Sequence, residues 1–233
     1  MKLTVIIPVY NEINTLEKII DKISKIDFIK IQIILVDDCS SDGTKELINL
    51  KLIEKVDKVI FHEKNLGKGA AIKSAKKFVE GDLVIIQDAD LEYDPNDYEK
   101  LIQPFINGET SVVYGSRVLE KNKFENLENF SHGIRIWGNT ILTIITNFIN
   151  GISLTDAHTC YKVFDTKLFK KIELFEDGFG FCPEITTKIS KLKERIHEIP
   201  INYSGRTYEQ GKKISWKDGI SAIRCIIKYN IFR

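Results

Sequence analysis

Two aspartates, Asp88 and Asp90, follow the apolar run Leu83–Ile86 at alternate positions, and Glu92 continues the series. Side chains two residues apart in an extended chain point the same way, so Asp88 and Asp90 can converge on one cation. Ligands that are all oxygen favour Mg²⁺ or Mn²⁺ over zinc. An Asp-x-Asp pair at a strand end is also common as a turn or a helix cap, so the surrounding elements have to decide between the two interpretations.

The first half of the chain alternates strands with helices. Strands are predicted from β-branched or continuous apolar runs at residues 3–10 (halted by Pro8), 31–36, 56–62 and 83–86. Helices are predicted between them, the first with Asn14 as its N-cap. This order predicts right-handed βαβ units and a mainly parallel α/β sheet, whose ligands bind beyond the carboxyl ends of the strands. Residues 8–12, 37–42 and 88–92 all fall at that edge.

The polar residues at this edge suit a nucleotide. Asp37 or Asp38 is placed to hydrogen-bond a base or a ribose. The alternative is capping of the next helix by Asp38, Ser40 or Asp42. The stretch NLGKG at residues 65–69 lacks the spacing of an ATPase phosphate loop, but its Lys68 can still lie near a nucleotide.

The composition is that of a globular protein. Of its 233 residues 43% are apolar, and 34 Lys+Arg against 33 Asp+Glu give no overall attraction to nucleic acid. Four widely spaced cysteines and no secretory signal predict reduced thiols in a cytoplasmic protein. Polar residues interrupt the apolar segment 134–154, which therefore lacks the ~18 uninterrupted apolar residues of a membrane span.

Four motifs at the strand ends carry a resemblance to a known family. They are VIIPVYNE (5–12), VDDCSSDGT (36–44), NLGKGAA (65–71) and QDADLE (87–92). In this order they resemble the signature of family 2 glycosyltransferases with the GT-A fold, a Rossmann-like, mainly parallel mixed sheet flanked by helices. The subgroup is similar to dolichol-phosphate mannose synthase and other polyprenyl-phosphate sugar synthases, and the resemblance runs from residue 3 to about 219.

The resemblance implies roles for the donor side of the site. The nucleotide sugar is expected to contact Pro8, Tyr10, Glu12, Asp38, Lys68, Ala89, Arg206 and Lys212. Asp88 and Asp90 are expected to frame the metal and the diphosphate, with Glu92 where the family often has Gln. Arg117 resembles an arginine near the reacting phosphates, although a surface ion pair is its alternative. Arg206 and Lys212 resemble the cations of a loop that closes over the diphosphate.

The second half is expected to serve the acceptor. Asp156 would lie under the acceptor phosphate or sugar, and His158 is expected to be structural. Glu184 is either a first-turn carboxylate favoured by the helix dipole or a site residue. Residues 134–152 form an apolar face, either of a core helix or of a helix on a membrane that guides a lipid phosphate to Arg135. Residues 121–129 are expected to form a mobile loop over the acceptor entrance.

These observations predict a GT-A domain over residues 1–219, with a nucleotide-sugar half (1–117) and an acceptor half with its closing loop (118–219). An amphipathic helix over 220–233 would pack on the core or dock on anionic lipid or on a membrane subunit.

The expected activity is metal-dependent, inverting transfer of a hexose from a GDP-mannose- or UDP-glucose-type donor to a polyprenyl phosphate at the cytoplasmic membrane face. The alternatives are transfer to a glycan hydroxyl, which would require Asp156 or Glu184 as general base, and a non-catalytic nucleotide-sugar-binding or regulatory partner of a membrane subunit.

Overall fold

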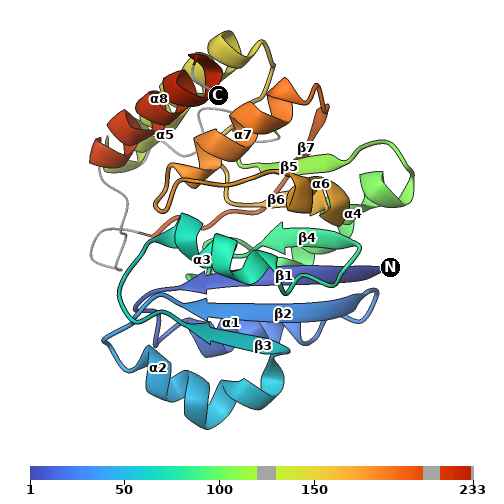
Figure 1. Cartoon of the computed structure of the whole chain (residues 1–233), viewed down its shortest axis with the longest axis vertical. Coiled ribbons are helices and arrows are strands. Elements are labelled where there is room, and N and C mark those ends of the chain that lie inside the picture. Colours follow the sequence, from blue (N-terminus) through green and yellow to red (C-terminus); the bar gives the residue numbers. More distant parts are fainter. Residues whose placement is uncertain (120–129, 207–215, 232–233) are drawn as a thin grey trace.

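The computed structural model describes residues 1–119, 130–206 and 216–231, and for residues 130–137 and 216–218 it describes the backbone alone. Its centre is a seven-stranded sheet flanked by helices (Figure 1), with the strand order β3-β2-β1-β4-β6-β5-β7. The strands are β1 (Lys2–Val9), β2 (Lys30–Asp37), β3 (Lys58–Phe61), β4 (Leu83–Ile86), β5 (Val112–Ser116), β6 (Lys162–Asp165) and β7 (Ile196–Pro200).

The sheet is mixed, as expected for the α/β class. Strands β1 to β4 pair in parallel with one another, and β5 pairs in parallel with β7. Strand β6 runs antiparallel to both of its neighbours, β4 and β5. The four residues of β4 are all buried, as are most residues of β1 and β2, because helices cover both faces of these continuous apolar strands.

The helices connect the strands in the predicted alternation. They are α1 (Leu16–Ile23), α2 (Thr44–Leu47), α3 (Lys68–Lys76), α4 (Tyr98–Ile106), α5 (Phe130–Asn150), α6 (Thr166–Lys171), α7 (Phe181–Lys191) and α8 (Trp216–Ile231). Short turns of other helix types are η1 (Ile48–Leu52), η2 (Ile53–Lys55) and η3 (Pro95–Asp97). No helix in the described part of the chain is long and apolar enough to cross a bilayer.

Two local predictions were wrong. Pro8 does not halt β1, which continues to Val9 with Pro8 opposite Val36. The strand tolerates a proline here because β4 pairs only with the part of β1 up to Ile6 and requires no hydrogen bond from Pro8. Asn14 does not cap α1, because the chain enters that helix through a turn whose cap residue is Thr15.

A buried hydrogen-bond cluster fixes the end of β4. The Gln87 side-chain oxygen accepts hydrogen bonds from the hydroxyls of Tyr98 at 2.6 Å and Tyr161 at 2.7 Å. All three side chains are fully buried. Since Gln87 directly precedes Asp88, this cluster determines where the chain leaves the sheet and where its carboxylates begin.

Helices α5 and α8 lie side by side at one end of the molecule (Figure 1) and also contact α7. Their outward faces are apolar. We define the α5–α8 surface by its exposed residues: Ile141, Ile144, Phe148, Ile220, Ile227 and Ile231. Phe148 is 87% exposed and Ile144 60%, whereas the inward face of α5 carries the buried Thr143 and Thr146. Where its side chains are described, from residue 138 on, the apolar face expected over residues 134–152 therefore points largely to solvent.

Candidate active site

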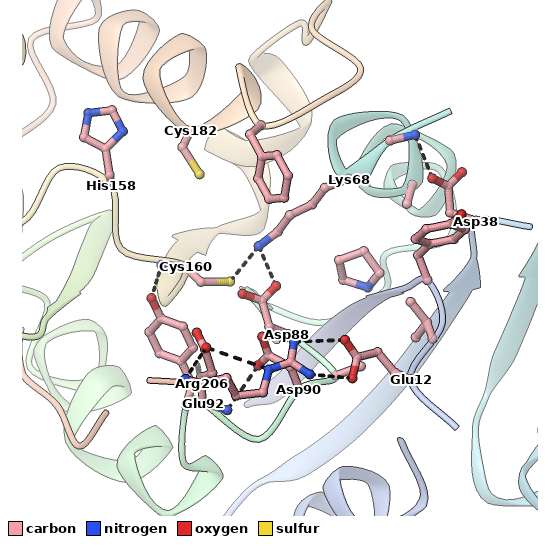
Figure 2. A pocket seen from close by; sticks show the side chains of 18 of the residues that line it. Glu12, Asp38, Lys68, Asp88, Asp90, Glu92, His158, Cys160, Cys182 and Arg206 are labelled. Atoms are coloured by element: carbon pink, nitrogen blue, oxygen red, sulfur yellow. Dashed lines mark hydrogen bonds and ion pairs between the residues drawn. The ribbon is translucent and has the colours of Figure 1, made fainter. Parts of the chain in front are cut away.

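A pocket of about 390 Å³ lies beyond the carboxyl ends of β1, β2 and β4, at the edge where the sequence predicts a ligand. Figure 2 shows how its charged side chains point toward one another. The predicted site residues among its lining are Pro8, Tyr10, Glu12, Asp38, Lys68, Asp88, Ala89, Asp90, Glu92, Arg117 and Arg206. The structure thus brings residues as far apart in the sequence as Pro8 and Arg206 together around one pocket.

Asp88 pairs with Lys68, the first residue of α3. The Lys68 ammonium group lies 2.5 Å from Asp88 Oδ1 and 3.1 Å from Cys160 Sγ (Figure 2). Burial acts to raise the pKa of Asp88, but the positive charge of Lys68 outweighs it and the pKa lies below its usual range. Asp88 is therefore an anion held by a fixed cation.

Arg206 lies among three carboxylates. Its guanidinium group donates to both oxygens of Glu12 at 3.0 Å and to Asp90 Oδ2 at 3.1 Å (Figure 2). Its backbone N–H donates to Glu92 Oε1 at 2.7 Å, and the Tyr203 hydroxyl donates to the other Glu92 oxygen at 2.7 Å. Glu92 thereby ties the segment after β7 to the loop after β4.

The predicted row of three metal ligands does not form. Among the residues that the structure describes, no three acidic, histidine or cysteine side chains are arranged to hold a metal ion. The physical reason is at Leu91, whose φ of 62° turns the backbone so that Glu92 cannot continue an extended row. Asp88 and Glu92 are instead engaged by Lys68 and by the Tyr203–Arg206 segment.

Asp90 nevertheless has the chemistry that a divalent cation requires. Burial and the negative charges of Asp88 and Glu92 raise the pKa of Asp90 to about 7, although Arg206 acts to lower it. Like charges that crowd one another in this way are relieved by a bound cation. Mg²⁺ usually takes one or two carboxylates and completes its shell with phosphate oxygens and water, so this donor set fits a metal bound together with a diphosphate.

Asp38 lines the pocket, and its carboxylate is already engaged. It accepts hydrogen bonds from the backbone N–H groups of Leu66 at 2.8 Å and Gly67 at 2.7 Å, and it lies 2.6 Å from His62 Nδ1. Asp38 therefore holds the loop that leads to Lys68. None of the three candidates caps the next helix, because the N-cap of α2 is Gly43 and no side-chain hydrogen bond caps the helix there. Asp42 accepts from the backbone N–H of Thr44 at 3.0 Å in the turn before that helix.

Arg117 and Asp156 form a buried ion pair. Arg117 Nε lies 2.6 Å from Asp156 Oδ2, and Arg117 Nη2 lies 2.8 Å from Asp156 Oδ1. Asn139 of α5 donates to the same carboxylate at 3.0 Å, and the guanidinium lies over the ring of Tyr203. Burial acts to raise the pKa of Asp156, but the pairing lowers it to about 2. Asp156 thus holds Arg117 in the pocket rather than facing an acceptor itself.

Glu184 lies in the first turn of α7 and outside the pocket lining. It is fully buried and accepts hydrogen bonds from the backbone N–H groups of Phe175 at 2.8 Å and Glu176 at 2.9 Å. These contacts correspond to its structural alternative. Arg135 lies in the first part of α5, residues 130–137, for which only the backbone is described. Lys212 and residues 121–129 lie outside the described residues.

Sequence reasoning missed several contributors to the pocket. His62 does not line the pocket but contacts Asp38, and it was not predicted, although its position after β3 at the same sheet edge was the available signal. The lining residues not assigned to the site were Val9, Asn65, Gly67, Ala71, Tyr93, His158, Cys160, Phe179, Cys182 and Tyr203. Five of these ten residues come from the second half of the chain.

Comparison with known sequences finds relatives that are named as glycosyltransferases. Residues 4–173 match the family described as "Glycosyl transferase family 2". The chain is 31% identical to a UDP-N-acetylglucosamine–dolichyl-phosphate N-acetylglucosaminyltransferase of Methanococcus voltae, over 84% of this chain and 83% of that protein. It is 30% identical to a dolichol-phosphate mannosyltransferase of Pyrococcus furiosus, over 92% of this chain and 61% of that protein. An undecaprenyl-phosphate mannosyltransferase of Micrococcus luteus is 27% identical, over 91% of this chain and 87% of that protein.

Solved structures share the fold. A glucosyl-3-phosphoglycerate synthase from Mycobacterium tuberculosis, in complex with Mn²⁺, uridine diphosphate and glucosyl-3-phosphoglycerate, superposes with a TM-score of 0.72 at 19% identity. The match covers 98% of this chain and 80% of that one. The same synthase has been crystallised with Mg²⁺ and uridine diphosphate, and that structure also has a TM-score of 0.72. This likeness confirms the GT-A fold expected from the sequence motifs.

Proposed function

This chain belongs to glycosyl transferase family 2, and we propose that it transfers a hexose from a nucleoside-diphosphate sugar to a polyprenyl phosphate. The carrying observation is the pocket itself, in which three cations, Lys68, Arg117 and Arg206, surround a space bordered by Asp88 and Asp90. Glu12, Asp38 and Glu92 also line the pocket, so the attraction to anions depends on a divalent cation bound at Asp90. With that cation present, the three positive side chains would suit two anionic reactants, a diphosphate and a phosphate, better than one anion and a neutral hydroxyl.

The donor would lie with its nucleoside at the ends of β1 and β2 and its diphosphate toward Asp90. A bound Mg²⁺ or Mn²⁺ would supply Lewis-acid stabilisation of the departing diphosphate. The chain's own cations would add to it, since Lys68 and Arg206 are held by carboxylates and need little reorganisation as charge develops. The proteins of similar fold that bind uridine diphosphate with Mn²⁺ or Mg²⁺ support this arrangement.

The acceptor side favours a phosphate. A phosphate monoester has a second pKa of roughly 6 and is already nucleophilic at neutral pH, so it requires no general base. A sugar hydroxyl would require one, and the two carboxylates proposed for that task are engaged, Asp156 by Arg117 and Glu184 by backbone N–H groups. The phosphate would approach Arg117 and attack the anomeric carbon opposite the diphosphate, which inverts that carbon.

The polyprenyl part of the acceptor is supported by relatives and by the surface. The relatives named above act on dolichyl or undecaprenyl phosphate. The α5–α8 surface exposes large apolar side chains, and the same α5 helix reaches the pocket wall through the bond between Asn139 and Asp156. We therefore propose that this surface lies on the cytoplasmic face of a membrane, where a lipid phosphate can reach Arg117.

The decisive experiment incubates the protein and Mn²⁺ with a panel of GDP- and UDP-sugars and short polyprenyl phosphates, and reads the product by mass spectrometry. A hexosyl polyprenyl phosphate is the expected product. Parallel reactions use a water-soluble phosphate, 3-phosphoglycerate, and free oligosaccharides. Transfer to oligosaccharides alone would contradict the proposal and favour the glycan alternative, while nucleotide-sugar binding without transfer to any acceptor would favour the non-catalytic alternative.

The metal is tested with a chelator and a matched pair of variants. EDTA should abolish transfer, and Mn²⁺ or Mg²⁺ should restore it. Asp90→Asn should lose most activity, whereas Asp82→Asn, at the opposite end of β4 with a side chain 66% exposed, should keep it. Full activity in EDTA would contradict the metal role.

Membrane contact is tested by co-sedimentation with vesicles that contain anionic lipid. Phe148→Ser and Ile144→Ser should weaken vesicle binding, because each removes exposed apolar area worth about 1.5–3 kcal/mol when fully buried. Leu50→Ser is the matched control, since Leu50 is 82% exposed but lies outside the α5–α8 surface. Equal sedimentation of all three variants with the wild type would contradict this orientation.

A further inference from the structure

The segment of residues 173–178, between α6 and α7, is held by the C-terminal helix through one carboxylate. Glu176 accepts hydrogen bonds from Arg224 Nη2 at 2.9 Å, from Lys228 Nζ at 2.8 Å and from the Tyr229 hydroxyl at 3.0 Å. Its side chain is only 12% exposed. Three side chains of α8 thus converge on a single residue of this segment.

The same segment packs against the turn that precedes α3. The backbone N–H of Ala70 donates to the carbonyl oxygen of Asp177 at 2.9 Å. A Cβ atom on Gly67 would lie 2.6 Å from that oxygen, and one on Gly69 would lie closer still to the carbonyl oxygen of Glu176. The two stretches of backbone are therefore in direct contact, with no room for a side chain between them.

Between these two contacts the segment is rigidly held. Both oxygens of the buried Glu184 accept backbone N–H groups of the segment, those of Phe175 and Glu176. Lys73 of α3 adds a hydrogen bond to the carbonyl oxygen of Phe175 at 3.0 Å. A displacement of Glu176 would consequently also displace the backbone around Gly67 and Gly69, because the segment between them is held by hydrogen bonds on both sides.

We propose that Glu176 is a positioning residue for the donor site, acting through the segment 173–178 on the Gly67–Lys68 turn. Lys68 reaches Asp88 from this turn, so the placement of its ammonium group depends on what packs behind the turn. The inference rests on the proposed function, since it takes the pocket to bind the diphosphate of a nucleotide sugar. It gives α8 a role in donor binding, although α8 contributes no described residue to the pocket lining.

The test is Glu176→Gln, measured by calorimetric titration with GDP and with UDP in the presence of Mn²⁺ and by steady-state kinetics. Loss of the charged hydrogen bonds should weaken nucleotide binding about tenfold and raise KM for the donor, with kcat little changed at saturating donor. Glu173→Gln is the control, because Glu173 is an exposed carboxylate of the same segment. A lower melting temperature with unchanged nucleotide affinity would overturn the inference.

A second variant covers the case in which Glu176→Gln fails to fold. Replacing Arg224 and Lys228 together by Gln and Met removes the same contacts from α8 and should give a similar loss of affinity, with little further loss when Glu176→Gln is added. Additive losses would overturn the inference. If the wild type binds neither GDP nor UDP with Mn²⁺, the proposed function fails as well; if it binds one and the variants bind it equally, the positioning role alone is overturned.

Discussion

The Arg117 side chain donates two hydrogen bonds of 2.6 and 2.8 Å to Asp156, whose carboxylate is fully buried, and the Arg117 backbone N–H donates a third at 3.2 Å. The pair converts a flexible cation into a fixed one at the edge of the pocket. The positive charge proposed to face the acceptor is thus held by a buried counter-charge.

Asp156→Asn should therefore affect both stability and rate. Removing one partner of a buried pair is expected to cost about 3 kcal/mol of unfolding free energy, because Arg117 is left without its counter-charge. Misplacement of Arg117 is expected to lower kcat by about 100-fold. Arg117→Lys should lose a similar factor in kcat, since a lysine cannot form the two-bond contact. Denaturant unfolding and steady-state kinetics measure the two effects, and an Asp156→Asn enzyme with wild-type kcat would contradict the positioning role.

Lys68→Met should weaken binding of the nucleoside diphosphate. It removes the cation nearest to Asp88 and leaves that partly buried carboxylate unpaired, so a loss of about tenfold or more in affinity is expected. Lys64→Met is the control, because Lys64 is exposed in the same loop. Equal calorimetric titrations of the two variants would contradict a role for Lys68 at the diphosphate.

Arg206 should have opposite effects on metal and nucleotide binding. In the structure its guanidinium lies between Glu12 and Asp90, where a divalent cation would also be attracted. Arg206→Gln should therefore bind Mn²⁺ alone more tightly than the wild type, by about tenfold if one charged contact is lost, and should bind the Mn²⁺–nucleotide complex more weakly. A titration monitored by the electron paramagnetic resonance signal of Mn²⁺, with and without nucleotide, measures these two affinities separately. A variant that binds Mn²⁺ alone more weakly would show that Arg206 does not compete with the metal.

His158 should make stability depend on pH in the mildly acidic range. Burial, with a smaller contribution from the charge of Lys162, lowers the pKa of His158 from 6.5 to about 4. Between these values the unfolded chain binds a proton that the folded chain does not, so stability is complete above pH 6.5 and decreases as the pH falls to about 4. The slope should approach about 1 kcal/mol per pH unit. Asp90, whose pKa is raised to about 7, contributes an opposing slope over the same pH range in every variant that keeps it. Urea unfolding at several pH values should therefore give a slope that is more positive in the wild type than in His158→Gln by about this amount.

Local sequence patterns were sufficient to predict strand β4 and the edge of the sheet at which the pocket lies. The apolar run Leu83–Ile86 forms β4 with the predicted bounds, because four consecutive apolar residues can be satisfied only inside a sheet covered on both faces. The donor-side residues with described side chains line one pocket, since parallel strands place their carboxyl ends together whatever the details of packing.

Tertiary structure decided which charges are paired. Arg206 meets Glu12 across 194 positions of sequence, and Asp156 meets Arg117 across 39, and no local rule relates such distant residues. Chain packing also left the apolar side of α5 exposed and its threonines buried, the reverse of what periodicity alone favours. By itself the sequence determined that acidic and basic groups would gather beyond β4. The positive φ of Leu91, a backbone conformation invisible to spacing, decided that Glu92 would tie down the Tyr203–Arg206 segment instead of extending the row of Asp88 and Asp90.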